Sequence, residues 1–113
     1  MKRSLLLILV LINLKNYSQN LQLQANLSYG TTALANIGGY VDSLGNEYAL
    51  VGTSLGLDIV DVTVPANPVI KFTIAGPTSE WREVKTYRKY AYVTTEDGAS
   101  GLTIIDLDRK SVV

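Results

Sequence analysis

Two pairs of matching segments limit this chain to a repeat architecture. Residues 47–53 (EYALVGT) match residues 89–95 (KYAYVTT), and residues 56–62 (GLDIVDV) match residues 101–107 (GLTIIDL). The offset is 42 residues in the first pair and 45 in the second. Loops tolerate such a difference in length and strands do not, because strands carry the pairing register. The chain therefore contains two copies of one structural unit, each roughly 40–45 residues long.

Each copy divides into short strands separated by turn residues. The pattern predicts strands over residues 37–42, 48–53, 57–62 and 69–74 in the first copy, and over residues 81–87, 89–95 and 102–107 in the second. Residues 43–46 (SLGN) have turn chemistry, and the two prolines in residues 64–68 (VPANP) cannot donate to a sheet ladder. No segment after Leu23 has helical periodicity. The prediction is an all-β fold, a partial β-propeller of about two consecutive four-stranded antiparallel blades.

The number of copies leads to a further expectation. We place blade 1 at about residues 36–76 and blade 2 at about residues 80–113, where the chain ends before a fourth strand could form. Closed propellers have about four to eight blades, and stacked repeats need a neighbour on each side. Two blades alone would leave two outer sheet faces apolar and exposed to water. We therefore expect this to be the N-terminal fragment of a longer chain. The missing blades of that chain would be partners that pack against the exposed sheet faces.

The first 18 residues have the features of a secretory signal peptide, here residues 1–18. The first three residues (MKR) supply positive charge, and residues 5–12 are an unbroken apolar run. A membrane-spanning helix needs about 20 apolar residues, so no transmembrane span is predicted. Cleavage between Ser18 and Gln19 would leave residues 19–35 as a lead-in segment and place the mature chain outside the cell or at its surface. The alternative is a buried N-terminal helix or strand.

Absent residue types exclude several chemistries for this sequence. The chain has no cysteine and no histidine. Disulfides, Ser-His-Asp triads, Cys-His pairs and the usual zinc sites are therefore excluded. We assign no cofactor, no metal site and no catalytic residue to it.

Charge argues against nucleic acid as a partner. The chain has ten basic and ten acidic residues, and removal of the signal peptide leaves seven basic and ten acidic ones, a net charge of about −3. Phosphate binding needs clustered lysines and arginines. One basic cluster is present, which we interpret as a solvated strand and turn, with contact to an anion as the alternative. Its residues are Arg82, Lys85, Arg88 and Lys89.

A run in the first copy carries a family resemblance. Residues 57–63 (LDIVDVT), followed by Pro65 and Asn67-Pro68, resemble an LVIVD-type repeat. Other segments resemble the start of the choice-of-anchor B family. They are residues 37–40 (IGGY), 47–52 (EYALVG), 81–85 (WREVK) and 90–93 (YAYV). The resemblance covers about residues 30–110. It implies an exported bacterial protein with propeller-like repeats, which varied C-terminal signals attach to the cell surface or release.

Two positions depart from that family's pattern. Gly38 lies where the family often has tryptophan, and Arg88-Lys89 replaces an expected turn of the Gly-Asn kind. The resemblance gives no anchoring mode and no assigned activity. It therefore implies an exported repeat architecture without catalytic residues that could be carried over.

Trp81, Arg82 and Glu83 form the most distinctive cluster of candidate ligand-binding residues. An exposed tryptophan beside charged residues can stack on a sugar or anchor a partner protein. Alternatively, Trp81 packs in the core between blades. Glu80, Glu83 and Glu96 suggest a glycoside hydrolase as a further hypothesis, which depends on the separation of two carboxylates in the fold.

Asp61 and Asp106 occur at equivalent ends of the third strand in each copy. Because they recur, we interpret them as structural residues whose carboxylates accept N–H bonds from the following turn. The alternative is that they line one face of the propeller. Residues 96–101 (EDGASG) lack the spacing of a calcium loop, which supplies about six to eight oxygen ligands, and are predicted to form a surface hairpin.

These features predict an exported, cell-surface or secreted binding scaffold with no chemistry of its own in these residues. Its partner would be a protein or a carbohydrate at the cell surface. The alternative is an extracellular propeller enzyme, a hydrolase or a lyase, with catalytic residues beyond position 113. A third hypothesis is a non-functional gene remnant.

Overall fold

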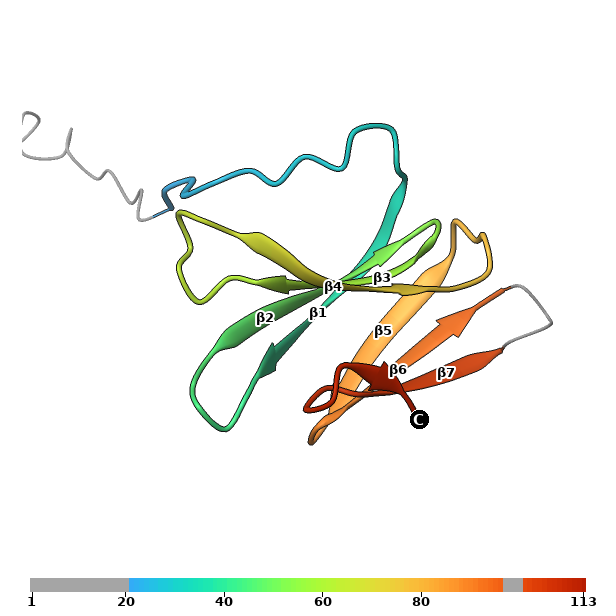
Figure 1. The fold of residues 1–113 in the computed structure, drawn as a ribbon. Coiled ribbons are helices and arrows are strands. Elements are labelled where there is room, and N and C mark those ends of the chain that lie inside the picture. Colours follow the sequence, from blue (N-terminus) through green and yellow to red (C-terminus); the bar gives the residue numbers. More distant parts are fainter. Residues whose placement is uncertain (1–20, 97–100) are drawn as a thin grey trace, which may run out of the picture.

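The computed structural model describes residues 21–96 and 101–113, which form two four-stranded sheets and contain no helix (Figure 1). Sheet A consists of β1 (Leu34–Val41), β2 (Glu47–Thr53), β3 (Gly56–Asp61) and β4 (Val69–Ala75). Sheet B consists of β5 (Arg82–Tyr87), β6 (Tyr90–Thr95), β7 (Leu102–Asp106) and β8 (Ser111–Val112). In each sheet the strands are antiparallel and follow chain order. The predicted all-β fold with two four-stranded antiparallel blades is confirmed.

The two sheets repeat the same pairing register. Tyr48 pairs with Asp61 between β2 and β3, and the equivalent pair between β6 and β7 is Tyr90 with Asp106. These residues also align in the sequence repeat, so equivalent residues occupy equivalent places in the two sheets. Each sheet is therefore one blade.

Turn chemistry fixes the first hairpin, between β1 and β2. The Oδ1 atom of Asp42 accepts hydrogen bonds from the backbone N–H groups of Leu44 and Asn46, each 2.9 Å long. Gly45 has a φ of +84°, a left-handed value that glycine adopts without strain. The hydrogen bond from the Asn46 side chain is the largest effect that lowers the pKa of Asp42. These contacts close the turn predicted at residues 43–46.

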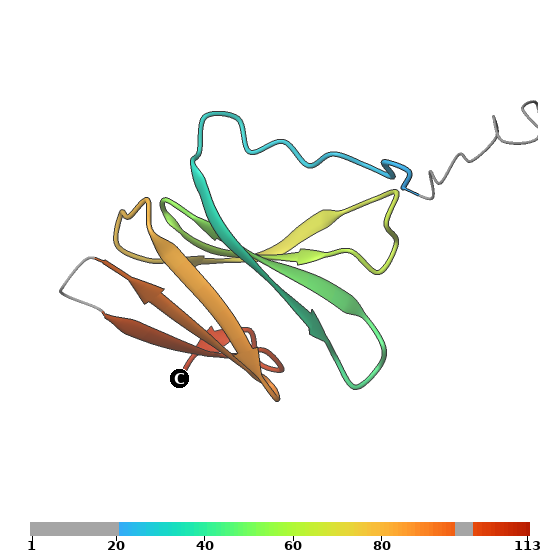
Figure 2. The same ribbon diagram turned by 180° about the vertical axis from the view of Figure 1, so that it is seen from behind.

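The core lies between the two sheets. Its buried side chains are Leu50, Leu57 and Ile59 from sheet A, and Val84, Ala91, Val93, Ile105 and Leu107 from sheet B. β1 and β5 lie side by side, as seen from both directions (Figures 1 and 2). A Cβ atom on Gly38 of β1 would lie 3.3 Å from Cγ1 of Val84 in β5. Glycine therefore permits this approach, and a large side chain at position 38 would push the sheets apart.

A second contact between the sheets joins a lysine to aromatic rings. Lys110, which follows β7, places its Nζ atom 5.6 Å from the ring centre of Tyr48 and 5.5 Å from that of Phe72. Tyr48 stacks against Tyr40 with ring centres 6.2 Å apart, and the Tyr40 hydroxyl donates to Oδ1 of Asp108 at 3.2 Å. A cation is attracted to the negative face of an aromatic ring. These contacts hold the last turn of sheet B against sheet A.

One outer face of sheet A is partly covered, which corrects the expectation that both outer faces are exposed to water. Ala25, Leu27 and Tyr29 in the lead-in segment are half-buried, whereas the residues between them are exposed. The three half-buried side chains line an apolar pocket of about 310 Å³, whose other wall comes from β1, β2 and β3. Every second side chain of the lead-in segment thus covers hydrophobic surface of sheet A, which the repeat alone would leave exposed.

The expectation that blade 2 ends before its fourth strand is wrong. β8 pairs with β7, and Val112 lies opposite Ile105. The backbone N–H of Lys110 donates to the carbonyl of Asp106 at 2.7 Å, and Lys110 has a φ of +55°. The chain therefore reverses directly after β7. A two-residue strand is too short to show an alternating pattern in the sequence.

Several predicted features fall outside the described residues. These are the signal peptide at residues 1–18, its cleavage position between Ser18 and Gln19, and residues 97–100 of the predicted hairpin. The strands on either side of that hairpin, β6 and β7, are paired antiparallel. Over residues 21–96 and 101–113, no helix is long and apolar enough to cross a membrane.

Candidate functional site

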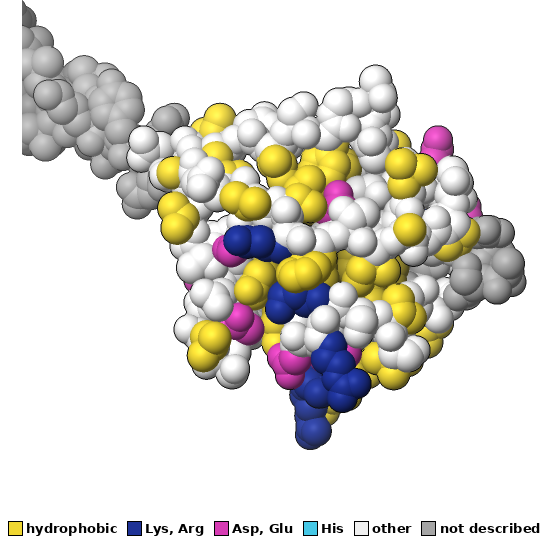
Figure 3. Space-filling view, viewed as in Figure 1, with side chains coloured by type: hydrophobic (Ala, Val, Ile, Leu, Met, Phe, Trp, Pro, Cys, Tyr) yellow, Lys and Arg dark blue, Asp and Glu magenta, His cyan; other side chains and the backbone are white. Residues whose placement is uncertain are grey.

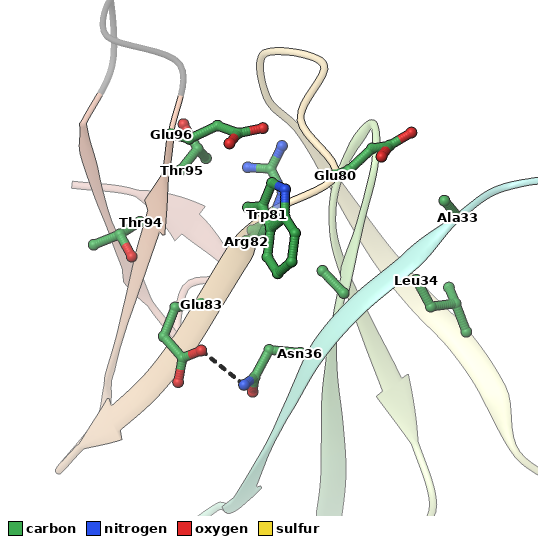
Figure 4. A pocket seen from close by; sticks show the side chains of 11 residues that line it. Ala33, Leu34, Asn36, Glu80, Trp81, Arg82, Glu83, Thr94, Thr95 and Glu96 are labelled. Carbon is green, nitrogen blue, oxygen red and sulfur yellow. Dashed lines mark hydrogen bonds between the residues drawn. The ribbon is translucent and has the colours of Figure 1, made fainter.

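A pocket of about 790 Å³ lies between the start of β1, the start of β5 and the end of β6. We call it the β1–β5 pocket, and Figure 4 shows the side chains that line it. Its lining includes the three predicted ligand-binding residues, Trp81, Arg82 and Glu83, together with Glu80 and Glu96. The volume lies within the range of about 300–1,000 Å³ that small-molecule sites occupy. The pocket is therefore large enough for a ligand.

Trp81 presents its indole to this pocket. It precedes β5 and is 72% exposed, so it is not part of the core between the two sheets. The Oγ of the buried Ser79 donates to the Trp81 carbonyl at 2.9 Å and accepts from the Trp81 N–H at 3.2 Å. This short loop fixes the backbone where the chain enters β5. The indole of Trp81 is exposed, whereas the side chain of the next residue, Arg82, is buried.

Arg82 lines the pocket, but only 4% of this residue's surface is exposed. Its Nε donates to the carbonyl of Thr53 at 2.9 Å, and its Nη2 donates to the carbonyl of Pro77 at 2.6 Å. Burial lowers the pKa of the Arg82 guanidinium. The interpretation of the basic cluster as a solvated strand and turn is therefore wrong for Arg82. This residue fastens the end of β2 and the loop before β5 to β5 itself.

The rest of the basic cluster does not line the pocket. Lys85 and Arg88 are exposed, and Lys89 is half-buried. Figure 3 shows basic side chains gathered at the tip of the molecule where the β5–β6 turn lies. Arg88 in this turn has a φ of +54°, a left-handed value that strains a residue with a Cβ atom. Lys89 pairs with Asp106, its Nζ lying 3.3 Å from Oδ2.

Glu83 connects the two sheets at the pocket wall. Nδ2 of Asn36 in β1 donates to Oε2 of Glu83 at 2.8 Å, as Figure 4 shows. The Nζ of Lys85 lies 2.7 Å from Oε1 of Glu83. Exposed ion pairs contribute only about 0–1 kcal/mol to stability, so these contacts orient the carboxylate more than they stabilise the fold. Asn36 was not among the predicted site residues, because its partner Glu83 is 47 residues away in the chain.

Glu80 and Glu96 stand at the rim of the pocket, on either side of Trp81 in the view of Figure 4. Both are exposed, and neither forms an ion pair with another described residue. Oγ1 of Thr95, in the same lining, is buried and has no hydrogen-bond partner in the described part of the chain. Such an orphaned hydroxyl is costly unless water or a ligand binds it. The fold thus brings Glu80, Glu83 and Glu96 to one pocket.

The recurring aspartates lie at the ends of β3 and β7, outside this pocket. Oδ1 of Asp106 accepts hydrogen bonds from the N–H groups of Asp108 at 3.0 Å and Arg109 at 3.2 Å. Oδ1 of Asp61 accepts one from the N–H of Thr63 at 3.0 Å. Burial works to raise the pKa of Asp106, but the hydrogen bonds that it accepts hold this pKa below its ordinary value. Among the residues described, no three His, Cys, Asp or Glu side chains are grouped to hold a metal ion.

The fold and the pocket together define a repeat scaffold of the β-propeller class. A family model described as the LVIVD repeat matches residues 38–75 and 80–111, which correspond to sheets A and B. The chain therefore belongs to the LVIVD repeat family. No curated protein and no solved structure matches it.

Proposed function

We propose that this chain is an exported binding scaffold of the choice-of-anchor B type, secreted or held at the cell surface, and that its β1–β5 pocket binds a ligand there. The observation that carries the proposal is the indole of Trp81, which is exposed within a pocket of about 790 Å³. A large aromatic side chain gains free energy when it leaves water, so this one offers a surface for a partner to cover. Tryptophan is among the residues that most often dominate binding energy.

The pocket favours binding over catalysis. Glu80, Glu83 and Glu96 are all exposed to water. The general acid of a glycoside hydrolase is instead shielded from water, because burial adjusts its proton affinity to the reaction. Glu83 is further engaged through both oxygens, by Asn36 and by Lys85. A scaffold that binds without reacting fits these side chains best.

Trp81 is the single tryptophan of the chain, so its fluorescence reports on the pocket directly. We would titrate the full chain with soluble peptides and with neutral oligosaccharides. A ligand that covers the indole should shift its emission to shorter wavelength, because the ring leaves water. In calorimetry the Trp81→Ala chain should lose binding. Tyr87→Ala, which removes an exposed aromatic ring outside the pocket, should bind like the unchanged chain.

Two outcomes would contradict the binding function. The first is an emission spectrum that no member of the panel changes. The second is equal affinity of the Trp81→Ala and unchanged chains for the same ligand, because binding would then take place elsewhere.

Export is a separate part of the proposal, supported by the sequence of residues 1–18 and by the resemblance to the choice-of-anchor B family. The full chain would be produced in a secreting bacterial host, and the exported product would be sequenced from its N-terminus. We expect Gln19 or a close neighbour as the first residue. Retention of the uncleaved chain inside the cell would contradict export.

A further inference from the structure

We infer that the β1–β5 pocket selects an organic cation, an ammonium or guanidinium group of the kind that a lysine or arginine side chain presents. This inference rests on the proposed binding function and names the class of ligand. It depends on three features of the pocket: the free face of its indole, the hydrogen-bonding groups that remain unused, and the charge of its lining.

The indole of Trp81 is an unoccupied cation-binding surface. Cations already lie over four other aromatic rings in the described residues: Tyr87, Tyr90, Tyr48 and Phe72. None of these contacts uses Trp81. Indole attracts cations more strongly than phenol or benzene rings do. The ring with the strongest attraction for cations thus has no cation over it among residues 21–96 and 101–113.

The guanidinium and amide side chains of the pocket already donate hydrogen bonds within the fold. Arg82 donates to two backbone carbonyls, and the Asn36 side chain donates to Glu83. The carboxylates of Glu80 and Glu96 remain, and they accept hydrogen bonds without donating any. A sugar hydroxyl both donates and accepts, whereas an ammonium or guanidinium only donates. The two unused carboxylates therefore favour a ligand that brings several charged donors.

The charge of the lining favours the same ligand. Arg82 is the one cation among the lining residues, and three carboxylates oppose it. Lys85, just outside the lining, neutralises only Glu83. A concave surface with excess negative charge concentrates cations, since its walls focus the field. Oγ1 of Thr95, a buried atom of the lining, has no hydrogen-bond partner among the described residues.

The test compares ligands that differ only in charge. Blocked alanine pentapeptides with a central lysine, arginine or norleucine would be titrated into the full chain by calorimetry and by Trp81 fluorescence. Norleucine has the apolar stem of lysine and lacks the ammonium. The lysine and arginine peptides should bind at least tenfold more tightly than the norleucine peptide. Their affinity should fall several-fold between about 20 mM and about 150 mM salt, because salt screens the carboxylates.

Variants locate the effect in the pocket. Glu80→Gln and Glu96→Gln should each weaken binding of the lysine peptide at least threefold. Glu47→Gln makes the same change in net charge at an exposed β2 residue outside the pocket, and its affinity should stay within twofold. Trp81→Phe should give an intermediate loss, since a phenyl ring binds cations more weakly. Far-UV circular dichroism would show that each variant retains its strands.

The outcomes separate this inference from the binding function. Equal affinity for the lysine and norleucine peptides would refute the proposal that the pocket selects a cation. Unchanged affinity in both glutamine variants would refute it as well. A neutral oligosaccharide could instead bind in a way that depends on Trp81 while the charged peptides do not bind. That result would refute selection of a cation and would agree with the proposed binding function. Absence of any binding that depends on Trp81 overturns both. Spermidine in a parallel titration identifies the source: tighter binding than the lysine peptide assigns the cation to a free amine, and weaker binding assigns it to a protein side chain.

Discussion

Replacing Gly56 with alanine tests how closely the strands of blade 1 pack. Gly56 begins β3 and has a φ of +156°, and its equivalent in the second copy, Gly101, has a φ of +24°. A Cβ atom on Gly56 would overlap the carbonyl oxygen of Ile74 and lie 3.0 Å from the Cα of Ala75. A Cβ atom on Gly101 would have no heavy atom of the described residues within 4 Å. Gly101→Ala is therefore a matched control with the same chemical change.

The expected difference follows from this comparison. Both alanines are strained by about 1–3 kcal/mol, because residues with a Cβ atom rarely adopt a positive φ. Only Gly56→Ala also forces β3 and β4 apart, and insertion of an extra methyl group into a packed site costs about 1–3 kcal/mol more. We take about 2 kcal/mol as the difference in the free energy of unfolding between the two variants. In a domain of this size that corresponds to about 8–16 °C in Tm.

The assay is urea unfolding of the full chain, followed by far-UV circular dichroism. Circular dichroism reports on the strands, whereas the fluorescence of the exposed Trp81 changes little on unfolding. With a slope of about 2 kcal/mol per M urea, the midpoint of Gly56→Ala should lie about 1 M below that of Gly101→Ala. A Gly56→Ala chain that fails to fold while Gly101→Ala folds agrees with the argument. Equal midpoints, or a lower one for Gly101→Ala, would refute it, because β4 would then have moved at no cost.

Three further changes test other contacts. Lys110→Gln removes the charge above the rings of Tyr48 and Phe72 and should lower the free energy of unfolding by about 1 kcal/mol in urea unfolding; an unchanged midpoint would contradict the contact. Arg88→Gly should raise the free energy of unfolding by about 0.5–1 kcal/mol, because relief of the left-handed strain exceeds the entropic cost of glycine, and a lower Tm would count against this reasoning. The folded-state pKa of Asp106 lies below its ordinary value, so its ionised form stabilises the fold above the unfolded pKa of about 4, and this contribution is lost as the pH falls through the folded pKa. A plot of Tm against pH in the acid range should therefore be flatter for Asp106→Asn, and a plot as steep as that of the unchanged chain would contradict the prediction.

The blades could be predicted because their signals are local. A strand was predicted at residues 69–74, and β4 is Val69–Ala75. β1 begins at Leu34 and not at the predicted residue 37, because the register shifts between Leu34 and Ile37 and no alternation marks the residues between them. The packing of residues 25–29 against sheet A was not predicted either. It depends on contacts between the lead-in segment and strands that follow much later in the sequence.

The candidate site was only partly visible in the sequence. Trp81 and Glu83 stand out because they lie two residues apart in a short, distinctive run. Asn36 and Glu96 join them only through the fold, since each comes from a different strand or strand end. The burial of Arg82 could not be foreseen, because arginine is mostly exposed and its two acceptors are backbone carbonyls with no residue-specific signal.

The pocket arises where the two copies of the repeat differ. Gly38 pairs with Leu50, and Lys85 pairs with Tyr92, which is the repeat equivalent of Leu50. Gly38 and Lys85 therefore occupy equivalent positions in the first strand of each blade. In blade 1 this position lets the sheets approach each other, and in blade 2 it supplies the ammonium that orients Glu83. Residues shared by the copies build the blades, whereas the pocket depends on residues that one copy has and the other lacks. The pattern common to both copies therefore predicts the blades and does not predict this site.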